Sequence, residues 1–245
     1  MFRFPHDVYV DVRIVESHNT EIRFKELVLQ SQKIRTEKGA LIRVFDGTRW
    51  YYGSTTDLEN IQASMDTLVQ MATPNPDILN HPVVQAFQVN QEKMLRYEAD
   101  SVTKISIEEK QALLEEILAQ IADPAIVNHN SRYVDNKTIK SFFSSKGAAI
   151  TFDQQTCGIR MTLDIVCGEN KDQAGISKGA TFFSDLGGYK QYFQDEIAKS
   201  IAFIRDAEPV VPGEYTVLLS PEATGVFTHE SFGHKSESDF MVGDE

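Results

Sequence analysis

Cysteine is scarce in this sequence. Only Cys157 and Cys167 occur among its 245 residues, and their spacing matches neither a CxxC redox motif nor a disulfide-rich framework. We therefore expect two reduced, half-buried thiols. A small secreted protein held together by disulfides is excluded.

Long apolar runs are also lacking. The chain has no stretch of about 18 consecutive apolar residues, the length that a membrane-spanning helix needs. Its first residues, Met1 to Asp7, lack the apolar segment of a secretory signal. These features predict a cytoplasmic protein without a membrane partner.

Positively charged residues are fewer than negatively charged ones. The sequence has 24 Lys and Arg residues and 36 Asp and Glu residues, for a net charge of −12. No cluster of Lys and Arg in the sequence is long enough to follow a phosphate backbone, so nucleic acid is not expected as a direct partner. The glycines of segment 167–188 lack the spacing of a phosphate-binding loop. We expect a mobile polar loop there.

The hydrophobic content, 41%, is sufficient for a sizeable core. Alternation of apolar and polar residues predicts strands in two groups, separated by helical sequence. A turn is expected at 17–19, with His18 as a solvated loop residue, and a hairpin turn at Asp46-Gly47. Further breaks are expected at 135–136, at 146–147 and at Thr156. The predicted strands are 8–15, 21–29, 40–45 and 49–52, then 125–134, 137–144, 148–155 and 157–166.

Helical periodicity appears over 58–72, 110–121 and 189–207. Ser106 to Glu109 has the signature of a capping box, which marks the start of the second of these helices. Together, the strands and helices predict an α+β fold, an antiparallel β meander with packed helices.

The Pro- and Gly-containing stretch 209–213 indicates a boundary. We expect an N-terminal α+β domain over 1–208 and the beginning of a second, mostly β domain over 209–245, with a buried strand at 214–221. A domain usually has many more residues than this, so the second domain is expected to be truncated in this chain.

The strongest chemical motif is His229-Glu230-Ser231-Phe232-Gly233-His234. Two imidazoles and a carboxylate are the groups needed to hold a divalent metal and activate water on it. On an ideal α-helix, residues five apart lie roughly 140° apart around the axis. His229 and His234 therefore share a face only if the helix contains a π-turn. The alternative is two unrelated histidines at a polar helix end.

This motif, with Glu237, Asp239 and Phe240 after it and the stretch 212–221 before it, closely resembles that of the TldD/PmbA family of metalloproteases. The stretches 43–47 and 53–58 also resemble the family's hairpin and first helix. The resemblance spans most of the chain. It is closer to the TldD-type subunit, because the PmbA type lacks the metal motif.

The resemblance implies a zinc site with His229 and His234 as ligands and Glu230 as the general base. In the family, the third ligand is a cysteine from far into the C-terminal domain, whereas both cysteines of this chain precede the motif. Glu237 or Asp239 could replace it as a ligand, or could lie around the site without binding the metal. A catalytic zinc needs three protein ligands, so two histidines alone are expected to bind weakly.

The resemblance further implies a zinc-dependent peptidase that acts on unfolded or short peptides and pairs with a PmbA-type (TldE-like) subunit or with itself. An exposed strand edge could hold the peptide as an added strand. One alternative is a non-catalytic peptide- or partner-binding module of a two-subunit protease, because region 8–207 contains no catalytic constellation. A fragment without a function of its own is the third possibility.

Overall fold

The computed structural model describes residues 2–239, which divide into two compact units, 2–207 and 208–239. We call them unit 1 and unit 2. No helix among the described residues combines the length and the apolarity that crossing a membrane requires.

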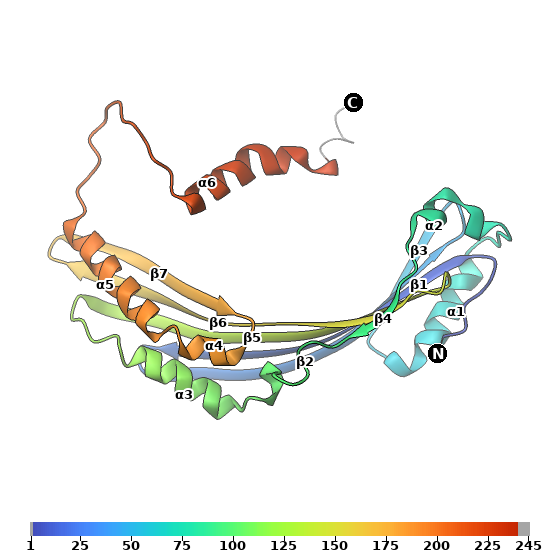
Figure 1. The fold of residues 1–245 in the computed structure, drawn as a ribbon, viewed down its shortest axis with the longest axis horizontal. Coiled ribbons are helices and arrows are strands. Elements are labelled where there is room, and N and C mark those ends of the chain that lie inside the picture. Colours follow the sequence, from blue (N-terminus) through green and yellow to red (C-terminus); the bar gives the residue numbers. More distant parts are fainter. Residues whose placement is uncertain (1, 240–245) are drawn as a thin grey trace. The chain divides into compact units, whose positions relative to one another are not determined.

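Unit 1 is organised around one seven-stranded sheet (Figure 1). The strand order is β3-β2-β1-β5-β6-β4. β4 pairs with the start of β6, and β7 pairs with β6 from Cys157 to Cys167. The described pairs are antiparallel except for β4 and β6, which are parallel. The predicted α+β fold with an antiparallel sheet is therefore confirmed. The strands are β1 (Tyr9–Lys25), β2 (Val28–Phe45), β3 (Trp50–Thr55), β4 (Gln91–Met94), β5 (Ile126–Ser144), β6 (Ala149–Cys167) and β7 (Asn170–Ala180).

The helices of unit 1 pack on the sheet through their apolar stripes. Three of them match the sequence prediction closely: α1 (Ile61–Met71), α3 (Ile107–Leu118) and α5 (Lys190–Asp206). The capping box of α3 is also confirmed, because the Ser106 hydroxyl accepts from the Glu109 N–H and the Glu109 carboxylate accepts from the Ser106 N–H. The shorter elements are η1 (Leu58–Asn60), η2 (Ile78–Asn80), α2 (Pro82–Ala86), η3 (Val102–Lys104) and α4 (Phe183–Gly187).

The two faces of the sheet are covered differently. Even-numbered residues of β1 face the main helices: Val10 and Val12 pack with α1, and Ile22 packs in a cluster with α3 and α5. On the other face, Tyr9 packs in a cluster with Ile78 and Val84 of η2 and α2. This second covering lies at one end only. Along the rest of β1, the odd-numbered side chains from 17 to 25 are half-buried or exposed. We call this side the open face.

The strand breaks predicted at 17–19, at 135–136 and at Thr156 are wrong. β1 continues through His18, which is paired with Thr36 of β2 and Lys137 of β5. The imidazole is half-buried and lies 3.0 Å from the Thr36 hydroxyl and 3.1 Å from the Glu16 carboxylate. Ladders on both sides satisfy the backbone of an inner strand, so polar residues on an open face do not end it. The β1–β2 turn instead lies at Glu26, whose φ is 54°.

The predicted mobile loop over 167–188 is also wrong. Most of it forms β7 and α4. Gly168 has a φ of 65°, which is a left-handed conformation that suits glycine, and it makes the turn between β6 and β7. Gly175 and Gly179 lie within β7, where pairing with β6 outweighs their low strand propensity.

Unit 2 contains α6 (Pro221–Thr228), the π-turn η4 (His229–Gly233) and the 3-10 turn η5 (His234–Ser236). The strand predicted at 214–221 is wrong, because its residues are exposed and unpaired, and α6 already begins at Pro221. The backbone N–H and C=O groups of a strand need hydrogen-bond partners on a neighbouring strand, and residues 208–239 contain no strand that could supply them. The mostly β character expected after residue 209 is thus absent from this described part. The assignment of 209–245 to a second domain stays a prediction.

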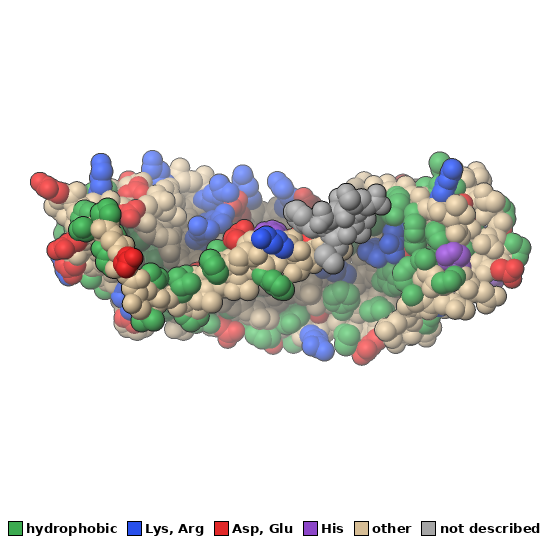
Figure 2. Space-filling view, turned by 90° about the horizontal axis from the view of Figure 1, so that it is seen from above, with side chains coloured by type: hydrophobic (Ala, Val, Ile, Leu, Met, Phe, Trp, Pro, Cys, Tyr) green, Lys and Arg blue, Asp and Glu red, His purple; other side chains and the backbone are tan. Residues whose placement is uncertain are grey.

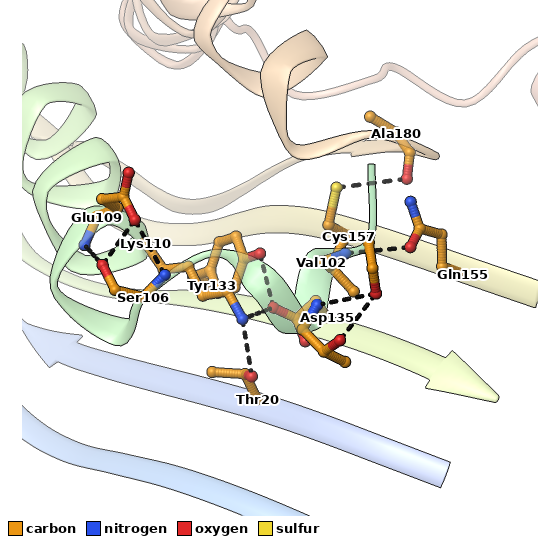
Figure 3. A network of polar contacts seen from close by, with 12 residues as sticks. Thr20, Val102, Ser106, Glu109, Lys110, Tyr133, Asp135, Gln155, Cys157 and Ala180 are labelled. Carbon is orange, nitrogen blue, oxygen red and sulfur yellow. Dashed lines mark hydrogen bonds and ion pairs between the residues drawn. The ribbon is translucent and has the colours of Figure 1, made fainter. Parts of the chain in front are cut away.

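A buried polar network fastens α3 to the sheet (Figure 3). The Lys110 ammonium lies 2.7 Å from the Asp135 carboxylate of β5 and donates to the Thr20 hydroxyl of β1 at 3.1 Å. The Tyr133 hydroxyl donates to the same carboxylate at 2.8 Å. Burial and the nearby carboxylates, Asp135 first, raise the pKa of Cys157 to about 12. Cys157 is therefore an unreactive thiol, and both cysteines are free as expected.

Asp46 anchors the β2–β3 hairpin and makes it sensitive to acid. Burial alone would raise its pKa, but donors, among them the N–H groups of Arg49, Thr48 and Thr73, lower it to about 2. The unfolded pKa is about 3.9, so this carboxylate stabilises the fold above pH about 4 and loses that effect as the pH falls toward 2. We expect Asp46→Asn to lower the melting temperature at pH 7 and to flatten its decline between about pH 4 and pH 2, as measured by circular dichroism. Asp77→Asn, an exposed control, should keep the wild-type slope, and an equal slope in Asp46→Asn would contradict the assignment.

Candidate metal centre

The candidate metal centre lies where α6 passes into a π-turn. Ser220 caps the helix by accepting from the Ala223 N–H at 3.2 Å, and Pro221 occupies the first turn, where no N–H is needed. At the other end, the His234 N–H donates to the His229 carbonyl oxygen, which is the i to i+5 hydrogen bond of a π-turn. The π-turn expected from the motif's spacing is therefore present.

The π-turn brings three side chains of the motif together. The rings of His229 and His234 lie with their centroids 4.5 Å apart, in an edge-to-face arrangement. One ligand atom from each of His229, Glu230 and His234 falls within 4.8 Å of the others, and all three residues are exposed. The donor set fits zinc, because two neutral imidazoles are preferred ligands and a neighbouring carboxylate can bind or act as a base.

Glu237 holds one of the imidazoles in place. Its carboxylate lies 2.6 Å from His234 Nδ1, whereas His234 Nε2 lies 3.7 Å from the Glu230 carboxylate. A histidine that binds a metal through one nitrogen commonly donates its other N–H to a carboxylate, which fixes the ring. The arrangement thus favours Glu237 as a support of His234 over Glu237 as a ligand. Among the described residues, neither Glu237 nor Asp239 belongs to the three-residue cluster.

The cluster supplies two imidazoles and one carboxylate but no thiolate. Cys157 is buried in unit 1 and Cys167 is half-buried there. Within residues 2–239, neither cysteine is part of the cluster. A cysteine from outside this chain stays a prediction.

Two histidines on one helical segment with a neighbouring carboxylate are a donor set of the kind that zinc sites use. A family model described as PmbA/TldA metallopeptidase domain 1 matches residues 10–72. A Methanothermobacter thermautotrophicus protein named Metalloprotease is 22% identical over 243 residues, which cover 96% of this chain and 51% of that protein. A Saccharolobus solfataricus protein named Zinc metalloprotease TldD homolog is 27% identical over 139 residues, which cover 55% and 31%.

Two solved structures share the fold. A Thermotoga maritima protein described as a candidate modulator of DNA gyrase aligns with a TM-score of 0.66 and 15% identity, over 84% of this chain and 46% of that one. TldE from Thermococcus kodakarensis aligns with a TM-score of 0.56 and 10% identity, over 80% and 44%. The chain is similar to proteins of the TldD/PmbA family, whose first-domain model matches its residues 10–72. It spans about half the length of the relatives that it matches over most of its own length.

Proposed function

We propose that this chain carries the metal motif of a TldD-type, zinc-dependent peptidase that hydrolyses unfolded or short peptides. The observation that supports the proposal is the π-turn, in which one ligand atom from each of His229, Glu230 and His234 lies within 4.8 Å of the others. His229 and His234 would hold the zinc, and a third ligand, expected to be a cysteine, would come from outside this chain. When bound, zinc polarises the scissile carbonyl and a water molecule.

The remaining chemistry falls to side chains of the motif. Glu230 accepts a proton from the attacking water and passes it to the leaving amine, as a general base and then a general acid. Glu237 keeps His234 oriented through the contact at Nδ1. Because the family includes TldD-type and TldE-type proteins, a TldE-like subunit or a second copy of the chain is the proposed partner.

The sheet offers an edge on which a peptide could add as a strand. β3 pairs with β2 only from Ala40 to Phe45. The outer side of β2 over 28–39 therefore has no strand partner among the described residues, and most of its side chains are exposed. Strand addition uses main-chain hydrogen bonds and tolerates many sequences, which suits unfolded substrates.

Zinc titration tests the metal site. We expect the chain to bind zinc in competition with a chromophoric chelator, and His229→Ala and His234→Ala each to weaken binding by at least about tenfold, because each removes one of two nitrogen ligands. His6→Ala, which removes an exposed histidine from unit 1, should leave the affinity unchanged. Wild-type affinity in both motif variants would refute the site.

A non-catalytic binding module is the second candidate. Its support is that the only potential metal cluster among residues 2–239 lies in unit 2, so the described part of unit 1 offers no metal-based chemistry. Mixing a labelled peptide with a form of the protein that includes the third zinc ligand separates the two functions. Zinc-dependent cleavage supports the peptidase, and binding without cleavage supports the module.

A further inference from the structure

Strand register assembles a row of three arginines on the open face of unit 1. Arg23 of β1 is the direct partner of Arg132 of β5, and Arg132 is the direct partner of Arg160 of β6. Directly paired residues in neighbouring strands carry their side chains on the same face, and strands lie about 4.8 Å apart. The three arginines therefore start from neighbouring positions on one face, across roughly 10 Å of sheet, in a chain whose net charge is −12.

Internal carboxylates neutralise only one member of this row. All three arginines are exposed. Arg23 pairs with Glu21 at 2.7 Å, but Arg132 and Arg160 form no ion pair with any residue of 2–239. Like charges placed directly opposite one another destabilise a sheet. Repulsion within the row therefore lowers the stability of the fold locally, and a bound anion would relieve it.

A hollow adjoins the arginine row. It has a volume of about 730 Å³. Arg160 of β6 pairs with Ser177 of β7, and the next pair on the same face is Gly158 with Gly179. Because neither glycine has a side chain, the floor of the hollow is low at this pair. Beyond that floor, Asn19, Asn136 and Thr156 line the hollow. The Asn136 amide donates to the Asn19 side-chain oxygen at 2.8 Å. Lys33 and Arg35 of β2 add positive charge at the rim.

Figure 2 shows Lys and Arg side chains gathered in the half of the molecule that carries β7 in Figure 1. We propose that the arginine row and the adjoining hollow form a binding site for acidic peptide segments. Guanidinium groups pair with carboxylates in a bidentate manner, and the amide and hydroxyl groups beyond the glycine floor can bond to a peptide backbone.

The chemistry of the hollow favours a peptide over a nucleic acid. No aromatic side chain of the described residues lines it, so these residues offer bases no stacking surface. Sites for single-stranded nucleic acid combine stacking with a long basic groove. Glu21 and Glu37 also lie among its lining residues, so negative charge is favoured only in the part of the hollow beside Arg132 and Arg160. The inference goes beyond the proposed function, because binding here requires no metal.

Fluorescence anisotropy with a dye-labelled peptide of eight glutamates, at low salt and with EDTA present, tests the site. We expect saturable binding that weakens at least tenfold in Arg132→Gln/Arg160→Gln and weakens as salt is raised. The matched control, Lys199→Gln/Arg205→Gln, removes two charges from α5, and its affinity should stay within twofold of wild type. An eight-residue glutamine peptide should not bind. EDTA separates this test from the metal site.

Equal affinity of the two double variants, or equal binding of the glutamine peptide, would overturn the proposal. Tighter binding of a single-stranded oligonucleotide than of the acidic peptide, lost in the same arginine variant, would also overturn it in favour of nucleic acid.

Thermal unfolding without ligand gives a second readout. The arginine variant should melt at a higher temperature than wild type at low salt, because repulsion within the row is relieved. A lower melting temperature would contradict the clustered charge.

Discussion

Replacing Glu230 with glutamine should lower peptide hydrolysis by about 10²- to 10⁴-fold, the usual contribution of a positioned acid–base group. Glutamine keeps the size and polarity of the side chain but does not accept a proton from water at neutral pH. The carboxylate lies 3.7 Å from His234 Nε2, on a residue adjacent to His229, and it is therefore beside the place where the two imidazoles converge. The measurement is turnover of a fluorogenic peptide by the form of the protein that is active with zinc.

The control for this change is Glu222→Gln, which removes an exposed carboxylate from the first turn of α6. Its turnover should stay within about twofold of wild type, because it lies outside the cluster. Zinc content, measured on the same samples, should be equal in all three proteins. Full turnover in Glu230→Gln would show that Glu230 is not the general base. Loss of turnover together with loss of zinc would instead make Glu230 a ligand.

Asp135→Asn should lower the free energy of unfolding by about 3–5 kcal/mol, the typical cost of removing one partner of a buried ion pair. Lys110 is 3% exposed and Asp135 is 2% exposed at the side chain, so the ammonium would be left buried with only the Thr20 hydroxyl and a neutral amide beside it. Because this pair joins α3 to β5, the loss acts on the contact between helix and sheet. Chemical denaturation followed by circular dichroism measures the effect.

Two further variants make this result specific. Glu116→Gln removes a carboxylate from the exposed pair with Lys190 and should cost no more than about 1 kcal/mol. Lys110→Met combined with Asp135→Asn removes both charges and should recover part of the loss, because no unpaired charge stays buried. A cost below about 1 kcal/mol for Asp135→Asn alone would show that the network adds little to stability.

Local sequence patterns predicted the elements that depend on neighbours along the chain. Helices α1, α3 and α5 follow from apolar periodicity, and the Ser106 cap follows from its side chain and that of Glu109. The π-turn follows from the five-residue spacing of His229 and His234, because only that register brings them together. The roles of these residues in chemistry stay predictions.

Features that depend on distant partners were missed. Polar dipeptides such as Asp135-Asn136 resemble turns locally, yet β5 runs through them, paired on both sides. β7 was missed because its glycines and charged residues are poor strand formers and only the ladder with β6 makes them a strand. The arginine row could not be predicted from the sequence for the same reason. Arg23, Arg132 and Arg160 are far apart in sequence, and only the register makes them neighbours.

The central position of β1 has a consequence for the order of folding. Its ladder with β2 closes through a short turn, but its ladder with β5 joins residues such as Asn19 and Asn136, which are 117 positions apart. At synthesis rates of about 5–20 residues per second, β5 leaves the ribosome roughly 6–23 seconds after β1. Until then the side of β1 that later pairs with β5 is unpaired, and charged residues of this strand, such as Glu16 and Arg23, discourage pairing with other chains.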